Sequence, residues 1–110
     1  MDQHLFPDLE SQSLATANRL ISEYQAVFEE LGLRVEPPEV ECTVPSNPRI
    51  ELSIFFWENL DFFDLLQVFI LWNGKPFGSK EEIEALIREA IEEIIQRRKA
   101  VLAAGADQTP

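Results

Sequence analysis

The segment Ile50–Trp72, IELSIFFWENLDFFDLLQVFILW, decides the fold and holds five of the eight phenylalanines and both tryptophans of the chain. Two kinds of side chain alternate along its first part. One face is apolar and carries Ile50, Leu52, Ile54 and Phe56. The other face changes from polar to aromatic and carries Glu51, Ser53, Phe55 and Trp57. This period of two residues predicts a β-strand over 49–57 with one buried face.

The second part of the same segment is apolar on both faces. Between 65 and 72 only Gln67 is polar, which predicts a strand that is central or covered on both sides. A short helix over 61–71 is an alternative, because the aromatic residues there also fit helical spacing. The β-branched and aromatic residues favour the strand, and Asn73-Gly74 predicts a tight turn after it.

Apolar and polar residues also alternate between 33 and 44, which predicts a further strand. One face would hold Val40, Cys42 and Val44, and the other Glu39, Glu41 and Thr43. Pro37-Pro38 has no N–H to donate, so this strand begins after the prolines or lies at a sheet edge. Glutamates along such an edge oppose aggregation. Cys42 lies on the apolar face, where we expect a buried, inert thiol.

Helical periodicity marks both ends of the chain. An apolar stripe predicts a helix over 10–31, and Gly32 stands where a left-handed C-terminal cap is expected. The capping box Ser79-Lys80-Glu81-Glu82 opens the final helix. The predicted fold class is α+β in the order α-β-β-β-α, with a three-stranded, mainly antiparallel sheet packed against two helices. We expect one domain over 1–110, with an ordered core at about 10–102 and flexible ends.

Charge narrows the classes of partner. The formal net charge is −11, and residues 1–64 alone carry thirteen acids against three bases. Nucleic acid and anionic membranes would be repelled, because both are bound through Lys and Arg. A basic protein is the expected partner, although the charge could serve solubility alone. Without a secretory signal or a membrane span, we expect a cytoplasmic location.

The residues that usually carry catalysis are scarce. Cys42 and His4 are the only cysteine and the only histidine, and the chain has no glycine-rich phosphate loop. Glu58, Asp61 and Asp64 could hold a hard cation, but they lack the alternating ligands and central glycine of a calcium loop. We therefore expect no enzyme activity, no cofactor and no metal, and we interpret these three acids as a solvated rim.

The connection Glu58–Asp64 is the predicted partner-binding site. A short link between two apolar strands is expected at the surface, yet this one combines acids with adjacent phenylalanines. In this interpretation Glu58, Asp61 and Asp64 attract a basic partner. The apolar anchor would come from Trp57, Phe62 or Phe63.

The segment 33–78 resembles a family of small immunity proteins from bacterial polymorphic toxin systems, the TriTu type. The shared features are Phe56-Trp57-Glu58, an acidic connection, an apolar strand, and Asn73-Gly74-Lys75-Pro76 before a polar-faced helix. The long strand at 65–72, apolar on both faces, departs from that pattern. The resemblance implies a cytoplasmic inhibitor that neutralises one cognate toxin domain by direct contact.

Three classes of function thus remain open. The first is an inhibitor of a basic enzyme, either an immunity protein or an acidic decoy that imitates nucleic acid. The second is a structural or adaptor module that pairs its aromatic hairpin with itself or with another protein. The third is an enzyme or a binder of small molecules. We expect a monomer or a weak homodimer, because an uncovered aromatic hairpin would leave an apolar patch.

Overall fold

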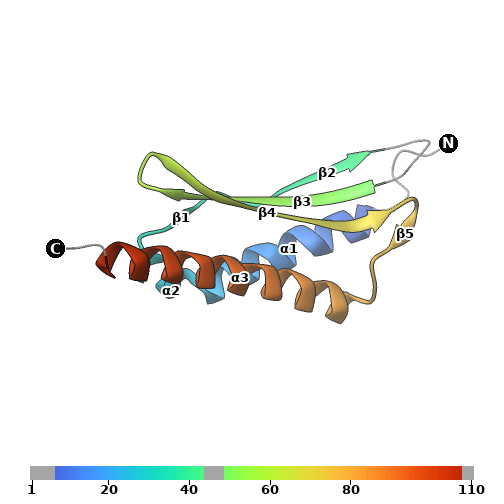
Figure 1. Ribbon diagram of the computed structural model, residues 1–110. Coiled ribbons are helices and arrows are strands. Elements are labelled where there is room, and N and C mark those ends of the chain that lie inside the picture. The colour runs from blue at the N-terminus through green and yellow to red at the C-terminus, as the bar shows by residue number, and fades with distance from the viewer. Residues whose placement is uncertain (1–6, 44–48, 108–110) are drawn as a thin grey trace.

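The computed structural model describes residues 7–43 and 49–107, which form three helices and five strands (Figure 1). The helices are α1 (Pro7–Glu23), α2 (Gln25–Glu30) and α3 (Lys80–Asp107). The strands are β1 (Arg34–Val35), β2 (Glu39–Thr43), β3 (Arg49–Glu58), β4 (Asp61–Trp72) and β5 (Lys75–Pro76). The predicted α+β class is confirmed. The predicted count of three strands is too low, because β1 and β5 add short pairings at the two edges of the sheet.

The sheet is antiparallel and is built on the long hairpin of β3 and β4. Both β1 and β2 pair with the same edge of β3, and β5 pairs with the end of β4. Pro37-Pro38 separates β1 from β2, because proline cannot donate to the ladder. The predicted edge strand is therefore present, with a break at the prolines.

The turn between β3 and β4 is much shorter than expected. Only Asn59 and Leu60 form it, because Glu58 already pairs with Asp61. Asn59 takes the left-handed conformation that a two-residue hairpin turn requires, with φ of 57°. The prediction of a loop over Glu58–Asp64 is thus wrong, and so is the alternative helix over 61–71. A register shift between Phe56 and Trp57 lengthens β4 by one residue at this end.

Helix boundaries also differ from the prediction. The helix expected over 10–31 begins at Pro7 and is interrupted at Tyr24, which separates α1 from α2. Gly32, with φ of 72°, closes α2 as expected. The N–H of Gly32 donates to the Glu29 carbonyl at 3.1 Å and that of Leu33 to the Phe28 carbonyl at 2.8 Å, which is a Schellman cap.

The capping box at the start of α3 is confirmed. The Ser79 N–H donates to Glu82 Oε1 at 2.9 Å, and the Glu82 N–H donates to Ser79 Oγ at 3.2 Å. The Ser79 N–H, followed by the Ser79 hydroxyl, favours the ionised carboxylate and lowers the pKa of Glu82. From there α3 continues to Asp107, past the expected end of the ordered core near 102.

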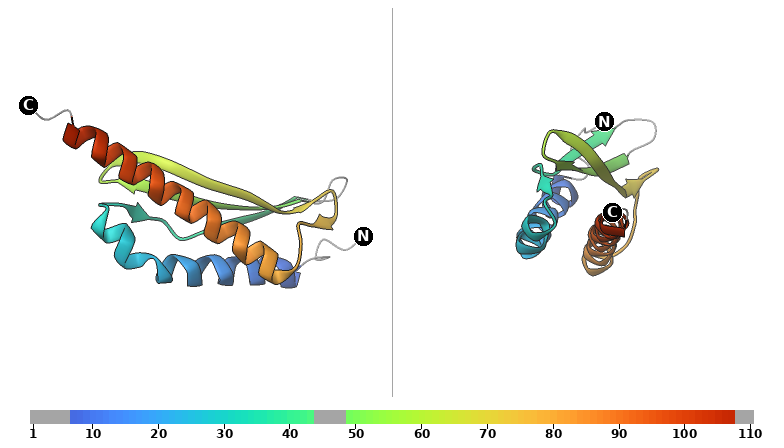
Figure 2. Two further views of the ribbon diagram at one scale, coloured as in Figure 1. Left: turned by 60° about the horizontal axis from the view of Figure 1, so that its bottom comes forward. Right: turned by 60° about the vertical axis from the view of Figure 1, so that its left-hand side comes forward.

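The helices pack on one face of the sheet, and no helix of the described chain lies on the other face (Figures 1 and 2). The core fills the space between the two layers. Its largest fully buried side chains are Phe28, Phe56, Leu20, Ile50, Leu52, Ile54, Ile70, Leu71, Ile87, Ile91 and Ile94. The rings of Phe28 and Phe56 meet edge to face at 5.6 Å. The apolar stripe of β3 is therefore buried against the helices, as predicted.

Candidate functional site

The uncovered side of the sheet, here called the open face, is the candidate site. The strand register brings its residues together from β2, β3 and β4. They are Glu39, Glu41, Arg49, Glu51, Ser53, Phe55, Trp57, Phe62, Leu65, Gln67, Phe69 and Trp72. The predicted alternation of β2 and β3 is confirmed, since Val40 and Cys42 pack on the core and the glutamates lie on the opposite side.

Three glutamates form the middle of the open face. Glu41 stands directly opposite Glu51, and the neighbouring Glu39 stands opposite Ser53. Together with Val40 and Phe55 these residues line a groove of about 280 Å³. Like charges directly opposite each other destabilise a strand pair by roughly 0.2–1 kcal/mol. Among the described residues, no ion pair offsets this repulsion.

Aromatic clusters lie at the two ends of the open face. At the hairpin end, the centroid of the Phe62 ring lies 5.8 Å from that of Trp57 and 6.4 Å from that of Phe55. At the other end, the rings of Phe69 and Trp72 meet edge to face at 4.9 Å. Phe62, Phe69 and Trp72 are 54%, 40% and 49% exposed. The face therefore offers exposed aromatic surface on both sides of an acidic centre.

An arginine covers each tryptophan of the open face. The Arg34 guanidinium lies 5.5 Å from the Trp57 ring, and that of Arg49 lies 5.4 Å from the Trp72 ring. These distances suit a cation–π contact. The Trp57 indole N–H also donates to Glu36. Each tryptophan ring therefore lies against a cation, and Trp57 is also hydrogen-bonded.

Ion pairs are confined to the helix side of the described chain. Arg19 and Arg88 connect α1 to α3 through Glu23 and Glu84. Arg97 and Arg98 connect α3 to the hairpin and to Glu93. Arg34 and Arg49, which lie against the two tryptophans, form none of these ion pairs, and within the described residues Glu39, Glu41 and Glu51 have no ion-pair partner. The middle of the open face is therefore acidic.

The structure divides the predicted partner-binding residues between two faces. Trp57 and Phe62 lie on the open face, as described above. Glu58 accepts a hydrogen bond from Arg98 at 3.1 Å, Asp64 pairs with Arg97, and Phe63 lies under the Arg98 guanidinium at 5.3 Å. Asp61 is exposed beside the turn. Within the described residues, no three His, Cys, Asp or Glu side chains gather as a metal site.

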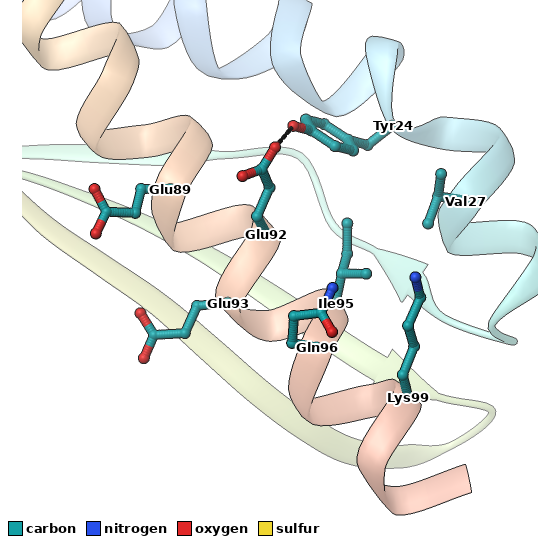
Figure 3. Close-up of a pocket in the computed structure, with 8 residues that line it drawn as sticks. All are labelled: Tyr24, Val27, Glu89, Glu92, Glu93, Ile95, Gln96 and Lys99. Carbon is teal, nitrogen blue, oxygen red and sulfur yellow. Dashed lines mark hydrogen bonds between the residues drawn. The ribbon is translucent and has the colours of Figure 1, made fainter. Parts of the chain in front are cut away.

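A second hollow, of about 520 Å³, lies between α3 and the α1–α2 junction (Figure 3). Tyr24 and Val27 line one side, and Glu92, Ile95 and Lys99 are among the α3 residues on the other. The Tyr24 hydroxyl donates to Glu92 at 2.6 Å. Burial and then this hydrogen bond raise the pKa of Tyr24. This hydrogen bond connects the α1–α2 junction to α3 across the hollow.

Cys42 is a free thiol that packs partly buried against the core. Burial raises its pKa, and the neighbouring Glu10 adds to the effect. A raised pKa keeps the thiol protonated at neutral pH, which disfavours nucleophilic chemistry. His4 lies outside the described residues.

Comparisons with protein-family models, with curated proteins and with solved structures found no match. None of the helices in residues 7–43 and 49–107 combines the length and apolar character needed to cross a bilayer.

Proposed function

We propose that this protein binds a basic protein through its open face and thereby inhibits it. The observation that supports this proposal best is that Glu39, Glu41 and Glu51, which have no ion-pair partner among the described residues, lie between exposed aromatic side chains. Burying aromatic anchors provides most of the affinity of a typical interface, while complementary charge speeds encounter and excludes wrong partners. The cost of placing Glu41 opposite Glu51 is offset when a Lys or Arg of the partner enters the groove.

The resemblance to immunity proteins of the TriTu type supports a more specific proposal. In it, the partner is a toxin domain that the protein neutralises in the cytoplasm by direct contact. Trp57, which belongs to the resemblance, lies on the open face beside Phe62. The electrostatic part of the site moves from Glu58, Asp61 and Asp64 to the three glutamates of the groove, because Glu58 and Asp64 already pair with α3.

A matched pair of charge variants tests the proposal. Candidate partners are captured from the native host and identified by mass spectrometry, starting with any basic protein encoded directly upstream. The site variant is Glu39→Gln, Glu41→Gln and Glu51→Gln. The control, Glu30→Gln, Glu81→Gln and Glu89→Gln, removes the same charge from exposed positions on the helices. We expect the site variant to slow association at least about tenfold and to lose protection against the toxin.

The control variant should bind and protect like the wild type. If both variants bound the partner equally weakly, net charge alone would govern binding. That result would overturn the proposed site on the open face. A captured partner that is acidic, or whose activity is unaffected by the protein, would overturn the inhibitor function. Phe62→Ala and Trp72→Ala should mainly speed dissociation, which stopped-flow and calorimetry separate from the charge effect.

A further inference from the structure

The two edges of the sheet differ in charge. The edge formed by β2 carries Glu39 and Glu41 within five residues. The edge formed by β4 is uncharged from Leu65 to Trp72, within the longest run of the chain that has no charged residue, 65–74. Proteins protect an exposed edge strand with charge, proline or a cover. The edge of β2 has such protection, and that of β4 carries no charge over most of its length.

The backbone along the outer edge of β4 is largely unpaired within the described chain. Its ladder partner on that side is β5, which pairs only at Leu71 and Trp72. The Phe77 N–H adds a hydrogen bond to the Ile70 carbonyl at 2.8 Å. Residues 62–69 therefore have a neighbouring strand on the β3 side alone.

One hydrogen bond shows which groups face outward. The Leu65 N–H donates to a side-chain acceptor, Asp64 Oδ1, at 2.8 Å. Because the direction of backbone groups alternates along a strand, the N–H groups of Gln67 and Phe69 point the same way, away from β3. These groups have no neighbouring strand on that side within residues 7–43 and 49–107, and unpaired edge groups are a template for another strand.

Exposed apolar surface is concentrated on β4 and on the segments at its two ends. Eight large apolar side chains of the described residues are exposed, and five of them lie between Leu60 and Phe77. They are Leu60, Phe62, Phe69, Trp72 and Phe77. A partner strand on the β4 edge would cover part of this surface as well as the free backbone groups.

We propose that β4 pairs antiparallel with β4 of a second copy, which joins two sheets into one around a two-fold axis. A strand paired with its own copy in antiparallel orientation satisfies that symmetry directly. Two chains of net charge −11 repel each other. This repulsion is weakest where the uncharged edges of β4 meet, so pairing through β4 is favoured. Pairing through β2 would bring Glu39 and Glu41 of both copies together. In the β4 dimer both open faces lie on the same side.

Gln67 provides a charge-reversal test, because it is exposed and lies in the middle of the free edge. In a symmetric dimer Gln67→Lys brings two cations close together, and Gln67→Glu two anions. We expect each variant to dimerise at least about tenfold more weakly than the wild type, by sedimentation velocity at about 100 µM. An equimolar mixture of the two variants should recover the dimer, because opposite charges then meet.

The controls are Gln12→Lys and Gln12→Glu, which make the same changes at an exposed position on α1. They should leave dimerisation unchanged, alone or mixed. A wild type that stays monomeric up to about 1 mM would overturn the proposal. It would also be overturned if both Gln67 variants dimerised like the wild type, or if their mixture failed to recover a dimer that each alone had lost. Circular dichroism checks that every variant is folded.

Discussion

Arg98 shows at the residue scale how one side chain joins three elements. It is only 4% exposed, and its Nε donates to the Leu31 carbonyl at 2.9 Å while Nη2 donates to Glu58. Its guanidinium also covers Phe63. The end of α2, the hairpin and α3 therefore meet at this cation. The sequence predicted Glu58 and Phe63 as partner contacts, but a buried arginine at this position makes them part of the packing.

Replacing Arg98 should destabilise the fold. Arg98→Met keeps much of the volume but leaves the Leu31 carbonyl and Glu58 without their donor, so we expect a loss of about 2 kcal/mol in the free energy of unfolding. The neighbouring Arg97→Met is the control. Its side chain is 50% exposed, and surface ion pairs contribute little, so its loss should stay below about 1 kcal/mol. Urea denaturation measures both, and equal losses would contradict this account of Arg98.

At the scale of single elements, the cap of α2 depends on backbone conformation. A Cβ added at Gly32 would meet Arg98 Nη2 at 3.5 Å, which is an ordinary contact. The cost of Gly32→Ala therefore comes from its φ of 72°, and we expect a loss of about 1 kcal/mol.

Gly105→Ala is the matched control for this prediction. Gly105 lies within α3, and apart from its chain neighbours and the adjacent backbone of the helix, no described atom lies within 4 Å of its added Cβ. Alanine is favoured over glycine inside a helix, so this variant should gain about 0.5 kcal/mol. Thermal unfolding compares the two variants. A neutral Gly32→Ala would show that the left-handed cap contributes nothing to stability.

Elements with a clear period were predictable from the sequence. The alternation of β3 identified both its buried face and its open face, and the capping box located the start of α3. The end of β4 at Trp72 was predicted together with the Asn73-Gly74 turn, but its start at Asp61 was not, because a strand that is apolar on both faces shows no period to mark its start. The interruption at Tyr24 was hidden for a similar reason, since the apolar stripe continues from α1 into α2 at helical spacing.

The candidate site was predictable only in part. The sequence placed Glu39 and Glu41 on one face of β2, and Glu51 on one face of β3. The register that sets Glu41 opposite Glu51 depends on how the two strands pair, and neither strand encodes this by itself. The predicted loop instead assigned Glu58 and Asp64 to the site. Their ion-pair partners lie 40 and 33 residues away along the chain, so the sequence did not reveal them.

At the scale of the whole molecule, two layers produce an elongated shape of 63 × 23 × 19 Å. The radius of gyration is 16.1 Å, against about 13 Å for a compact domain of this length. A single layer of helices covers one side of a long hairpin, so the second side of the sheet stays available for a partner. The same geometry spreads the negative charge over a large surface.

Stability should therefore respond to salt. At a net charge of −11 self-repulsion opposes folding, and it includes the contact between Glu41 and Glu51. Raising NaCl from about 10 mM to about 300 mM screens these charges, so we expect the unfolding midpoint to rise. Glu41→Gln should gain about 0.5 kcal/mol at low salt and less at high salt. A midpoint that falls with salt would mean that the ion pairs on the helix side dominate instead.

The placement of the two tryptophans has a practical consequence. Trp57 and Trp72 stand at opposite ends of the open face, each beneath an arginine, and the buried core contains phenylalanine but no tryptophan. Intrinsic tryptophan fluorescence therefore originates from the open face. Trp57→Phe and Trp72→Phe would each leave a single emitter, so that spectral shifts during a titration report which end of the surface a partner reaches first.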